Sequence, residues 1–267
     1  MPDMPGPYKA GTPCWIDLMV PDQQAALDFY GGLFGWLGEI GPPDTGGYSV
    51  CMLKGQPVAG IMKASNPDGS VPDPMPPAVW TTYLATDSVD AAEKAVRDAG
   101  GRVVMGPVDV MDLGRMAVVS DPQGAVFGLW EAGAFPGAGI VNEHGALIWN
   151  ELATSDTDAA ADFYSRILPL TPGPARIPGA EGYTAFSVGG RGVAGMMGLE
   201  GHPPGTPPHW LAYFHVDDVD AVADAAGQAG AKVLAPPFDS PAGRMSVIAD
   251  PQGAVFAAIT AAAPEQP

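Results

Sequence analysis

Two acidic residues, Asp17 and Glu151, each stand two positions after a tryptophan, Trp15 or Trp149. Residues two apart on a β-strand point to the same side, so each carboxyl group should lie beside an indole on one face of a sheet. Removal of water around a carboxyl group raises its pKa and lets it serve as a general acid or base. Asp17 and Glu151 are therefore candidate catalytic residues, and the two tryptophans are candidate ligand-binding residues.

The same acids could instead be structural. Arg115 and Arg244 are repeated cations, each within a Gly-Arg-Met phrase, in a chain that has only 12 lysines and arginines. An arginine that is placed twice suggests a defined partner, either the acids Asp17 and Glu151 or an anionic group of a ligand. Both interpretations stay open, and Arg115 and Arg244 are candidate ligand-binding residues.

The equivalence of these positions rests on an internal repeat. Residues 121–127 read Asp-Pro-Gln-Gly-Ala-Val-Phe, and residues 250–256 have the same seven letters. Other matched pairs are Trp15 and Trp149, Asp22 and Asp156, Tyr30 and Tyr164, Tyr48 and Tyr183, Gly60 and Gly195, Trp80 and Trp210, and Tyr83 and Tyr213. The shift between the copies is far longer than a solenoid repeat, so it indicates a duplicated domain.

Within each copy, strand patterns alternate with helix patterns. In the first copy, residues 14–20 predict a strand, Asp22 is typical of an N-cap, and the helix that follows should end near Gly31 and Gly32. Further strands are expected at 48–53, 58–62, 80–86, 102–105, 116–120 and 126–130, with a second helix at 89–99. The second copy has the same pattern, and the whole chain predicts an α+β fold.

Several phrases resemble the vicinal oxygen chelate superfamily, which includes glyoxalase I, bleomycin-resistance proteins and extradiol dioxygenases. They are Val20-Pro21-Asp22 with Ala26, Phe29, Tyr30 and Leu33-Phe34-Gly35-Trp36, then Asp217-Asp218-Val219-Asp220-Ala221, and Asp250-Pro251-Gln252-Gly253. The resemblance covers two glyoxalase-like domains at 10–132 and 145–261, joined by a linker at 133–144. It implies four βαβββ modules that form two curled mixed sheets with concave pockets. The tandem form is similar to actinobacterial glyoxalase-like proteins that carry the label "hydroxylase".

This resemblance allows the metal site of the superfamily to be tested position by position. Its enzymes place His, Gln or Glu ligands on the first strand, on the strand before the second helix, and after the final turn. The matching positions are Trp15, Thr81 and Gly128 in the first copy, and Trp149, Leu211 and Ala257 in the second. No imidazole or carboxylate stands there, and a slip by one residue would turn the side chain to the other face. We therefore expect no metal and no other cofactor.

Two aromatic pairs lie on the strand before the second helix of each copy. Trp80 and Tyr83 in the first copy match Trp210 and Tyr213 in the second. Because side chains of a strand alternate between its faces, one pair should line the pocket and the other the core. Tyr83 and Tyr213 are candidate ligand-binding residues, with core packing as the alternative.

Two polar residues are specific to the second copy. Asn150 matches Ile16 of the first copy, which has no amide, so the second pocket could be the more polar one. His215 lies on the same strand face as Leu211 and Tyr213, which makes it a candidate pocket residue. A structural or exposed histidine is the alternative, because no carboxylate accompanies it at chelating spacing.

Composition and charge exclude several classes of partner. A net charge of −18 repels phosphate backbones and anionic lipid, so neither nucleic acid nor a membrane is an expected partner. No apolar run is long enough for a membrane span or a signal peptide, and Cys14 and Cys51 are too few for a disulfide framework. We expect a cytoplasmic protein. It should be a monomer, since the fusion satisfies domain pairing within one chain, although a homodimer stays open.

Two functions of different class follow from these residues. The first is metal-independent binding of a small, largely apolar or aromatic metabolite, for natural-product binding, resistance or tailoring. The second is a metal-free enzyme, an isomerase, lyase or cyclase for a carbonyl-rich metabolite, with Asp17 or Glu151 as the acid–base group. A metal-dependent glyoxalase or dioxygenase is a third and weaker alternative. The sequence does not name the ligand.

Overall fold

The computed structural model describes residues 8–66, 69–175 and 177–262. The first copy consists of β1 (Pro13–Val20), α1 (Gln23–Phe34), the 3₁₀ turn η1 (Pro43–Thr45), β2 (Ser49–Leu53), β3 (Gln56–Lys63), β4 (Val79–Ala85), α2 (Val89–Asp98), β5 (Arg102–Val110), β6 (Gly114–Ser120) and β7 (Val126–Ala132). The second copy consists of β8 (Leu147–Thr154), α3 (Thr157–Ile167), β9 (Thr171–Pro174), β10 (Thr184–Val188), β11 (Arg191–Gly198), β12 (His209–His215), α4 (Val219–Gln228), β13 (Lys232–Ser240), β14 (Gly243–Ala249) and β15 (Val255–Ala261).

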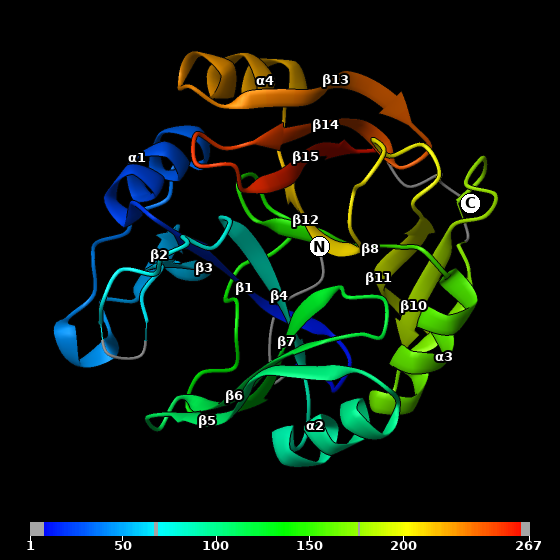
Figure 1. Cartoon of the computed structure of the whole chain (residues 1–267). Helices are drawn as coiled ribbons and strands as arrows, with labels where there is room; N and C mark the ends of the chain where they lie inside the picture. The colour runs from blue at the N-terminus through cyan, green and yellow to red at the C-terminus, as the bar shows by residue number, and fades with distance from the viewer. Residues whose placement is uncertain (1–7, 67–68, 176, 263–267) are drawn as a thin grey trace.

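Each copy forms one mixed sheet, which confirms the predicted α+β fold (Figure 1). The strand order is β2-β3-β1-β4-β7-β6-β5 in the seven-stranded sheet and β13-β14-β15-β12-β8-β11-β10-β9 in the eight-stranded sheet. Strands β1 and β4 pair antiparallel and join the two modules of the first sheet, as β8 and β12 do in the second. Three modules have the βαβββ order. In the first module, among the described residues, a single bridge between Leu37 and Met52 stands where β9 lies in the third.

Helix α1 shows how burial overrides local propensity. Its N-cap is Asp22, as predicted, and the Asp22 carboxylate accepts a hydrogen bond from the Ala25 N–H at 3.1 Å. The predicted end near Gly31 and Gly32 is wrong, because the helix continues to Phe34 and ends at Gly35 in the left-handed conformation (φ 73°). Each glycine within a helix costs about 1 kcal/mol, and burial of the Phe34 ring offsets that cost.

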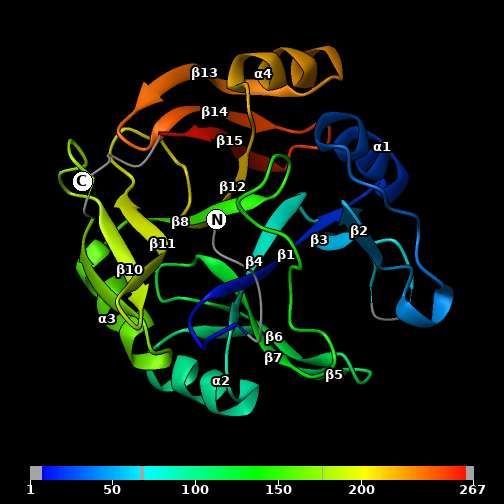
Figure 2. The same ribbon diagram turned by 180° about the vertical axis from the view of Figure 1, so that it is seen from behind.

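The hydrophobic cores are shared between the copies. One cluster combines residues of β1, α1 and β3 with residues of β12, α4 and β15, and a second combines α2, β6 and β7 with α3, β10 and β11. Accordingly, α1 lies beside α4, and α2 lies beside α3, in both views (Figures 1 and 2). Each helix therefore packs between its own sheet and elements of the other copy, so the two largest cores of the described structure are shared by both copies.

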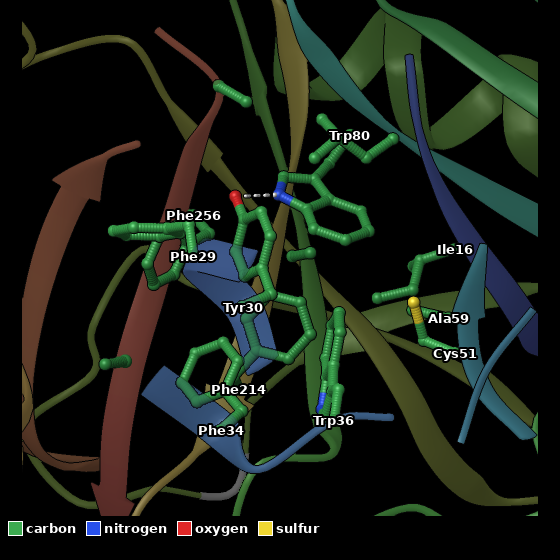
Figure 3. Close-up of a cluster of buried hydrophobic side chains, with 14 of the residues drawn as sticks. Ile16, Phe29, Tyr30, Phe34, Trp36, Cys51, Ala59, Trp80, Phe214 and Phe256 are labelled. Atoms are coloured by element: carbon green, nitrogen blue, oxygen red, sulfur yellow. Dashed lines mark hydrogen bonds between the residues drawn. The ribbon is translucent and has the colours of Figure 1, made fainter. Parts of the chain in front are cut away.

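The first of these cores is centred on Tyr30 (Figure 3). The Trp80 indole N–H donates to the Tyr30 hydroxyl at 3.1 Å, and that hydroxyl donates to the Asp250 carboxylate at 3.0 Å. Trp80 and Tyr30 belong to the first copy, whereas Asp250 belongs to the second. A fully buried polar chain thus crosses between the copies, and each of its groups has a partner.

The second core contains the same arrangement with the copies exchanged. Trp210 donates to the Tyr164 hydroxyl at 2.9 Å, and Tyr164 donates to Asp121 at 3.2 Å. The other oxygen of Asp121 accepts the N–H groups of Gly124 and Ala125, which closes its own turn. The identical heptapeptides that begin at Asp121 and Asp250 are therefore the sites where each copy binds the helix of the other. Trp80 and Trp210 are the core pair, which leaves Tyr83 and Tyr213 for the concave faces.

The substitution Tyr30→Phe should destabilise the protein by about 1–3 kcal/mol, because the Trp80 N–H and the Asp250 carboxylate would both lose a buried partner. Tyr164→Phe should have a similar effect. Urea unfolding followed by circular dichroism measures both, and a single transition is expected because the cores are shared. Separate transitions for the two copies, or an unchanged free energy of unfolding in both variants, would contradict this account.

Candidate functional site

The candidate sites lie on the concave face of each sheet. We call the face of the first sheet around Trp15, Asp17 and Tyr83 cup 1, and the face of the second sheet around Trp149, Glu151 and Tyr213 cup 2. In cup 1, the strand register places Trp15 opposite Tyr83, and Tyr83 beside Gly128. Asp17 lies between Gly60 and Thr81. The register of cup 2 is the same, with Trp149 opposite Tyr213, which lies beside Ala257.

A hydrogen-bonded network fills the floor of cup 1. The Trp15 indole N–H donates to the Tyr48 hydroxyl at 2.8 Å, and Tyr48 donates to the Asp17 carboxyl group at 3.4 Å. Tyr83 also hydrogen-bonds Asp17. Burial raises the pKa of Asp17 to about 7, against the smaller opposite effect of the hydrogen bonds from Tyr83 and Tyr48. Near neutral pH, Asp17 can therefore both give and take a proton.

Cup 2 has an equivalent network around Glu151. The Trp149 N–H donates to the Tyr183 hydroxyl at 2.9 Å, and Tyr213 donates to the Glu151 carboxylate at 2.7 Å. Tyr183 hydrogen-bonds Glu151 as well. The Glu151 side chain is as buried as that of Asp17, at 8% and 7% exposure. Tryptophan, two tyrosines and an acid thus form the same unit in both copies.

Tyr48 and Tyr183 are site residues that sequence reasoning did not propose. Each lies immediately before a strand, β2 or β10, and its hydroxyl group reaches over a glycine of the next strand. A methyl group at Gly60 or Gly195 would overlap the Tyr48 or the Tyr183 hydroxyl, respectively. The signal was present in the sequence, because the tyrosine and the glycine are repeated together.

The arginine residues are not part of either cup. Arg115 binds Asp90 at 3.1 Å and also binds Asp109, and Arg244 binds Asp220 and Asp239. These partners lie in the first turns of α2 and α4 and on β5 and β13. The repeated arginines connect a helix to a hairpin on the helix-covered face. The partners of Arg115 and Arg244 are therefore these four aspartates, and the expectation that they pair with Asp17 and Glu151 is wrong.

Asn150 and His215 also differ from expectation. Asn150 lies on the strand face opposite to Trp149 and Glu151, and its side-chain oxygen accepts the Thr82 hydroxyl of the other copy at 2.7 Å. It therefore connects the two copies and does not make cup 2 more polar. His215 follows the predicted strand face but lies at the end of β12, where its Nδ1 is 3.2 Å from the Ile259 carbonyl oxygen. Among the described residues, the hydrogen bonds of these two side chains go to Thr82 and Ile259 and not to the Glu151 network.

The metal ligands of the superfamily do not fit this chain. In the strand register, Trp15 lies opposite Tyr83, and Thr81 lies opposite Asp17. The Tyr83 ring lies over Gly128 and occupies the space of a side chain there. Among the described residues, no group of three or more His, Cys, Asp or Glu side chains is placed to hold a metal ion. Both cups present aromatic and hydroxyl groups in place of a ligand set.

An apolar rim surrounds the carboxyl group of cup 1. Val50 lies opposite Gly60, Val79 lies opposite Met19, and Val126 is two residues before Gly128, so all three valines share the face of Asp17. Their exposed fractions are 42%, 43% and 44%. Exposed apolar side chains that gather around a buried polar group are typical of a surface that binds a small molecule.

The chain belongs to the Glyoxalase/Bleomycin resistance protein/Dioxygenase superfamily, whose family model matches residues 14–129 and 146–257. It is 45% identical over 262 residues to "Putative glyoxylase CFP32" of Mycobacterium tuberculosis, covering 97% of this chain and 98% of the relative. It is 39% identical to "Anthracycline biosynthesis protein DnrV" of Streptomyces peucetius, covering 94% of both.

Solved structures show the same fold at low identity. The Mn(II)-bound glyoxalase from Novosphingobium aromaticivorans superposes with a TM-score of 0.62 at 17% identity, covering 94% of this chain and 82% of that chain. The 2,3-dioxygenase LapB from Pseudomonas sp. KL28 gives 0.63 at 13% identity, covering 98% and 97%. None of the helices among the described residues is long and apolar enough to cross a membrane.

The raised pKa of Asp17 predicts a pH dependence of stability. An unfolded Asp ionises near pH 4, whereas the folded carboxyl group keeps its proton up to pH 7. The contribution of Asp17 to stability therefore falls by up to about 1.4 kcal/mol per pH unit between pH 4 and 7, and is constant above pH 7. Asp17→Asn should remove this pH dependence, so the stability of the variant relative to that of the wild type should rise as the pH increases from 4 to 7.

Urea unfolding at half-unit steps from pH 4 to 8 measures the difference between the variant and the wild type. Asp224→Asn, at an exposed position of α4, is the matched control and should show a constant difference. A constant difference for Asp17→Asn as well would show that Asp17 is ionised throughout this range.

Gly60→Ala should destabilise the protein by about 1–3 kcal/mol, because the added methyl group overlaps the Tyr48 hydroxyl and must displace it. Gly173→Ala, on β9, is the control, since a methyl group there has no atom within 4 Å. Thermal unfolding of both variants makes the comparison. Equal melting temperatures would show that the tyrosine moves aside without cost.

Proposed function

We propose that cup 1 binds a small, largely apolar or aromatic metabolite and does so without a metal ion. The observation that carries the proposal is one buried carboxyl group, Asp17, within a surface of aromatic rings and exposed valines. Such a site buries the apolar body of a ligand and fixes its orientation through a few polar contacts. Binding of this kind would serve natural-product binding, resistance or tailoring.

The hydrogen-bond inventory of cup 1 favours a ligand with a carbonyl oxygen. The Trp15 N–H is used by Tyr48, and both tyrosine hydroxyl groups donate to Asp17. When Asp17 is protonated, its own O–H is the donor that this network leaves unused. A ligand carbonyl oxygen can accept that O–H, and an apolar body can then cover the valine rim.

The relatives support an aromatic, oxygenated ligand. One of them is named for anthracycline biosynthesis and another as a glyoxylase. The rings and exposed valines of cup 1 are compatible with an aromatic body. Metal independence is supported by the residues at the ligand positions of the superfamily, where Trp15, Thr81 and Gly128 stand in place of imidazole and carboxylate.

A second function, metal-free acid–base catalysis, is favoured by one observation. The pKa of Asp17 is about 7, and catalytic groups work best when their pKa lies near the working pH. Asp17 could protonate a ligand carbonyl or remove a proton beside it, with Tyr48 and Tyr83 stabilising the carboxylate that remains. An isomerase, lyase or cyclase reaction would use such a group. Glu151 is the corresponding acid of cup 2.

The binding proposal predicts a pH-dependent affinity for an uncharged aromatic ketone such as 9-fluorenone, which has no titratable proton. Only protonated Asp17 can donate to the carbonyl group, so the dissociation constant should be constant below pH 7 and rise about tenfold per pH unit above it. In Asp17→Asn, it should be independent of pH. Fluorescence titration from pH 5 to 9 measures both proteins.

Glu151→Gln is the matched control in cup 2 and should keep the pH dependence of the wild type. The titration is repeated with EDTA and with added Mn²⁺, and neither should change the affinity. Absence of fluorenone binding would refute the proposal, and so would binding that requires Mn²⁺. If purified protein converts a copurifying metabolite and Asp17→Asn still binds it without turnover, acid–base catalysis replaces simple binding.

A further inference from the structure

The linker between the copies crosses the Trp15 end of cup 1. The Ala138 N–H donates to the Cys14 carbonyl at 2.8 Å, and the Gly139 N–H donates to the Pro57 carbonyl at 2.7 Å. At the start of the linker, the Phe135 N–H donates to the Leu113 carbonyl at 3.0 Å. The linker is thus hydrogen-bonded to β1, β3 and the hairpin between β5 and β6, and its position is fixed by the first copy.

Phe135 is the linker residue that enters cup 1. Its ring meets the Trp15 indole edge-on, with centroids 4.9 Å apart, and lies 6.1 Å from the Trp130 ring. The Trp130 N–H donates to the Phe135 carbonyl at 3.0 Å. These contacts place Phe135 in one cluster with Trp15, Tyr83 and Trp130 on the concave face. The aromatic end of cup 1 therefore has a wall that belongs to neither repeat.

Among the described residues, which end at 262, cup 2 differs from cup 1 around the equivalent tryptophan. The equivalent of Trp130 is Ile259, which has no N–H to hold a crossing segment. Trp149 is partly exposed, whereas its equivalent Trp15 is only 6% exposed. Each cup has one acid and two tyrosines on the floor, and the cups differ in the cover of the tryptophan.

We propose that Phe135 is a specificity-determining residue that closes one end of cup 1 and limits the length of the ligand. The proposal rests on the proposed ligand-binding function of this cup. A ligand enters over the rim of Val50, Val79 and Val126, reaches Asp17, and extends no farther than the ring of Trp15. Trp15 is two residues from Asp17 on β1, a separation of about 7 Å, so one additional fused ring meets the wall.

Two uncharged aromatic ketones of different length test the limit. The wild type should bind the three-ring 9-fluorenone about tenfold or more tightly than the four-ring benzanthrone, because an added ring must displace Phe135. Phe135→Ala should bring the two affinities within about threefold, mainly through tighter binding of benzanthrone. Leu37→Ala, at an exposed site of the same copy, should keep the preference of the wild type.

A second variant, Trp130→Ile, tests the role of Phe135 even if Phe135→Ala does not fold. Trp130→Ile places the residue of cup 2 into cup 1 and removes the hydrogen bond that holds the Phe135 carbonyl group. It should shift the preference in the same direction as Phe135→Ala. An unchanged preference in both variants, with fluorenone still bound, would overturn the role of Phe135 and leave the proposed function intact.

The wall can also be measured without any ligand. In ¹⁵N-labelled protein, a neutral gadolinium chelate broadens indole N–H signals according to their exposure. In the wild type, the Trp149 signal should broaden more than the Trp15 signal. In Phe135→Ala, the broadening of the Trp15 signal should increase, and that of the Trp149 signal should not change. Equal broadening of the two indole signals in the wild type would show that Phe135 does not shield Trp15, and this result would reject the proposed role of Phe135 even if neither ketone binds. A protected Trp15 together with no ketone binding would refute the proposed function alone.

Discussion

The buried hydroxyl groups of Tyr30 and Tyr164 are the interaction on which the rest of the structure depends. Each accepts from a tryptophan of its own copy and donates to an aspartate of the other. A tyrosine hydroxyl buried without partners would cost several kcal/mol, so this chain of donors and acceptors is satisfied only when the two copies are docked. The shared cores have the same consequence for the apolar side chains. Docking on the helix-covered faces leaves the concave faces outside these shared cores.

This separation explains which repeated residues are scaffold and which belong to a site. The heptapeptides, the core tryptophans and the arginines all act on the helix-covered side, where they fix copies, helices and hairpins to one another. Among the described residues, Trp15, Asp17, Tyr48, Tyr83 and their equivalents form the hydrogen-bonded networks of the concave side. The longest identical segment of the chain therefore concerns assembly, and the candidate sites are formed by isolated residues whose spacing is repeated. Identity of sequence alone did not separate the two roles.

Much of the fold could be predicted from the sequence, because periodicity, N-caps and turns are local signals. The strands, the helix start at Asp22 and the placement of Asp17 beside Trp15 all follow from such signals. Register between distant strands is not local, so the sequence did not show that Tyr83 lies opposite Trp15 and Thr81 opposite Asp17. The partners of Arg115 and Asn150 were missed because they lie on other elements, α2 and β4. Tyr48 was missed because its hydroxyl reaches the site from the end of a loop.

Duplication gives two cups with one design, and the linker makes them different. A linker is the one segment of a tandem protein that has no equivalent between its copies, so it can change one site without changing the other. Here it covers Trp15 and leaves Trp149 partly exposed. Burial raises the pKa of Asp17, which stands two residues after Trp15 on β1. The environment of cup 1 therefore depends on both segments: the first copy supplies the buried carboxyl group, and the linker supplies the Phe135 ring that packs on Trp15.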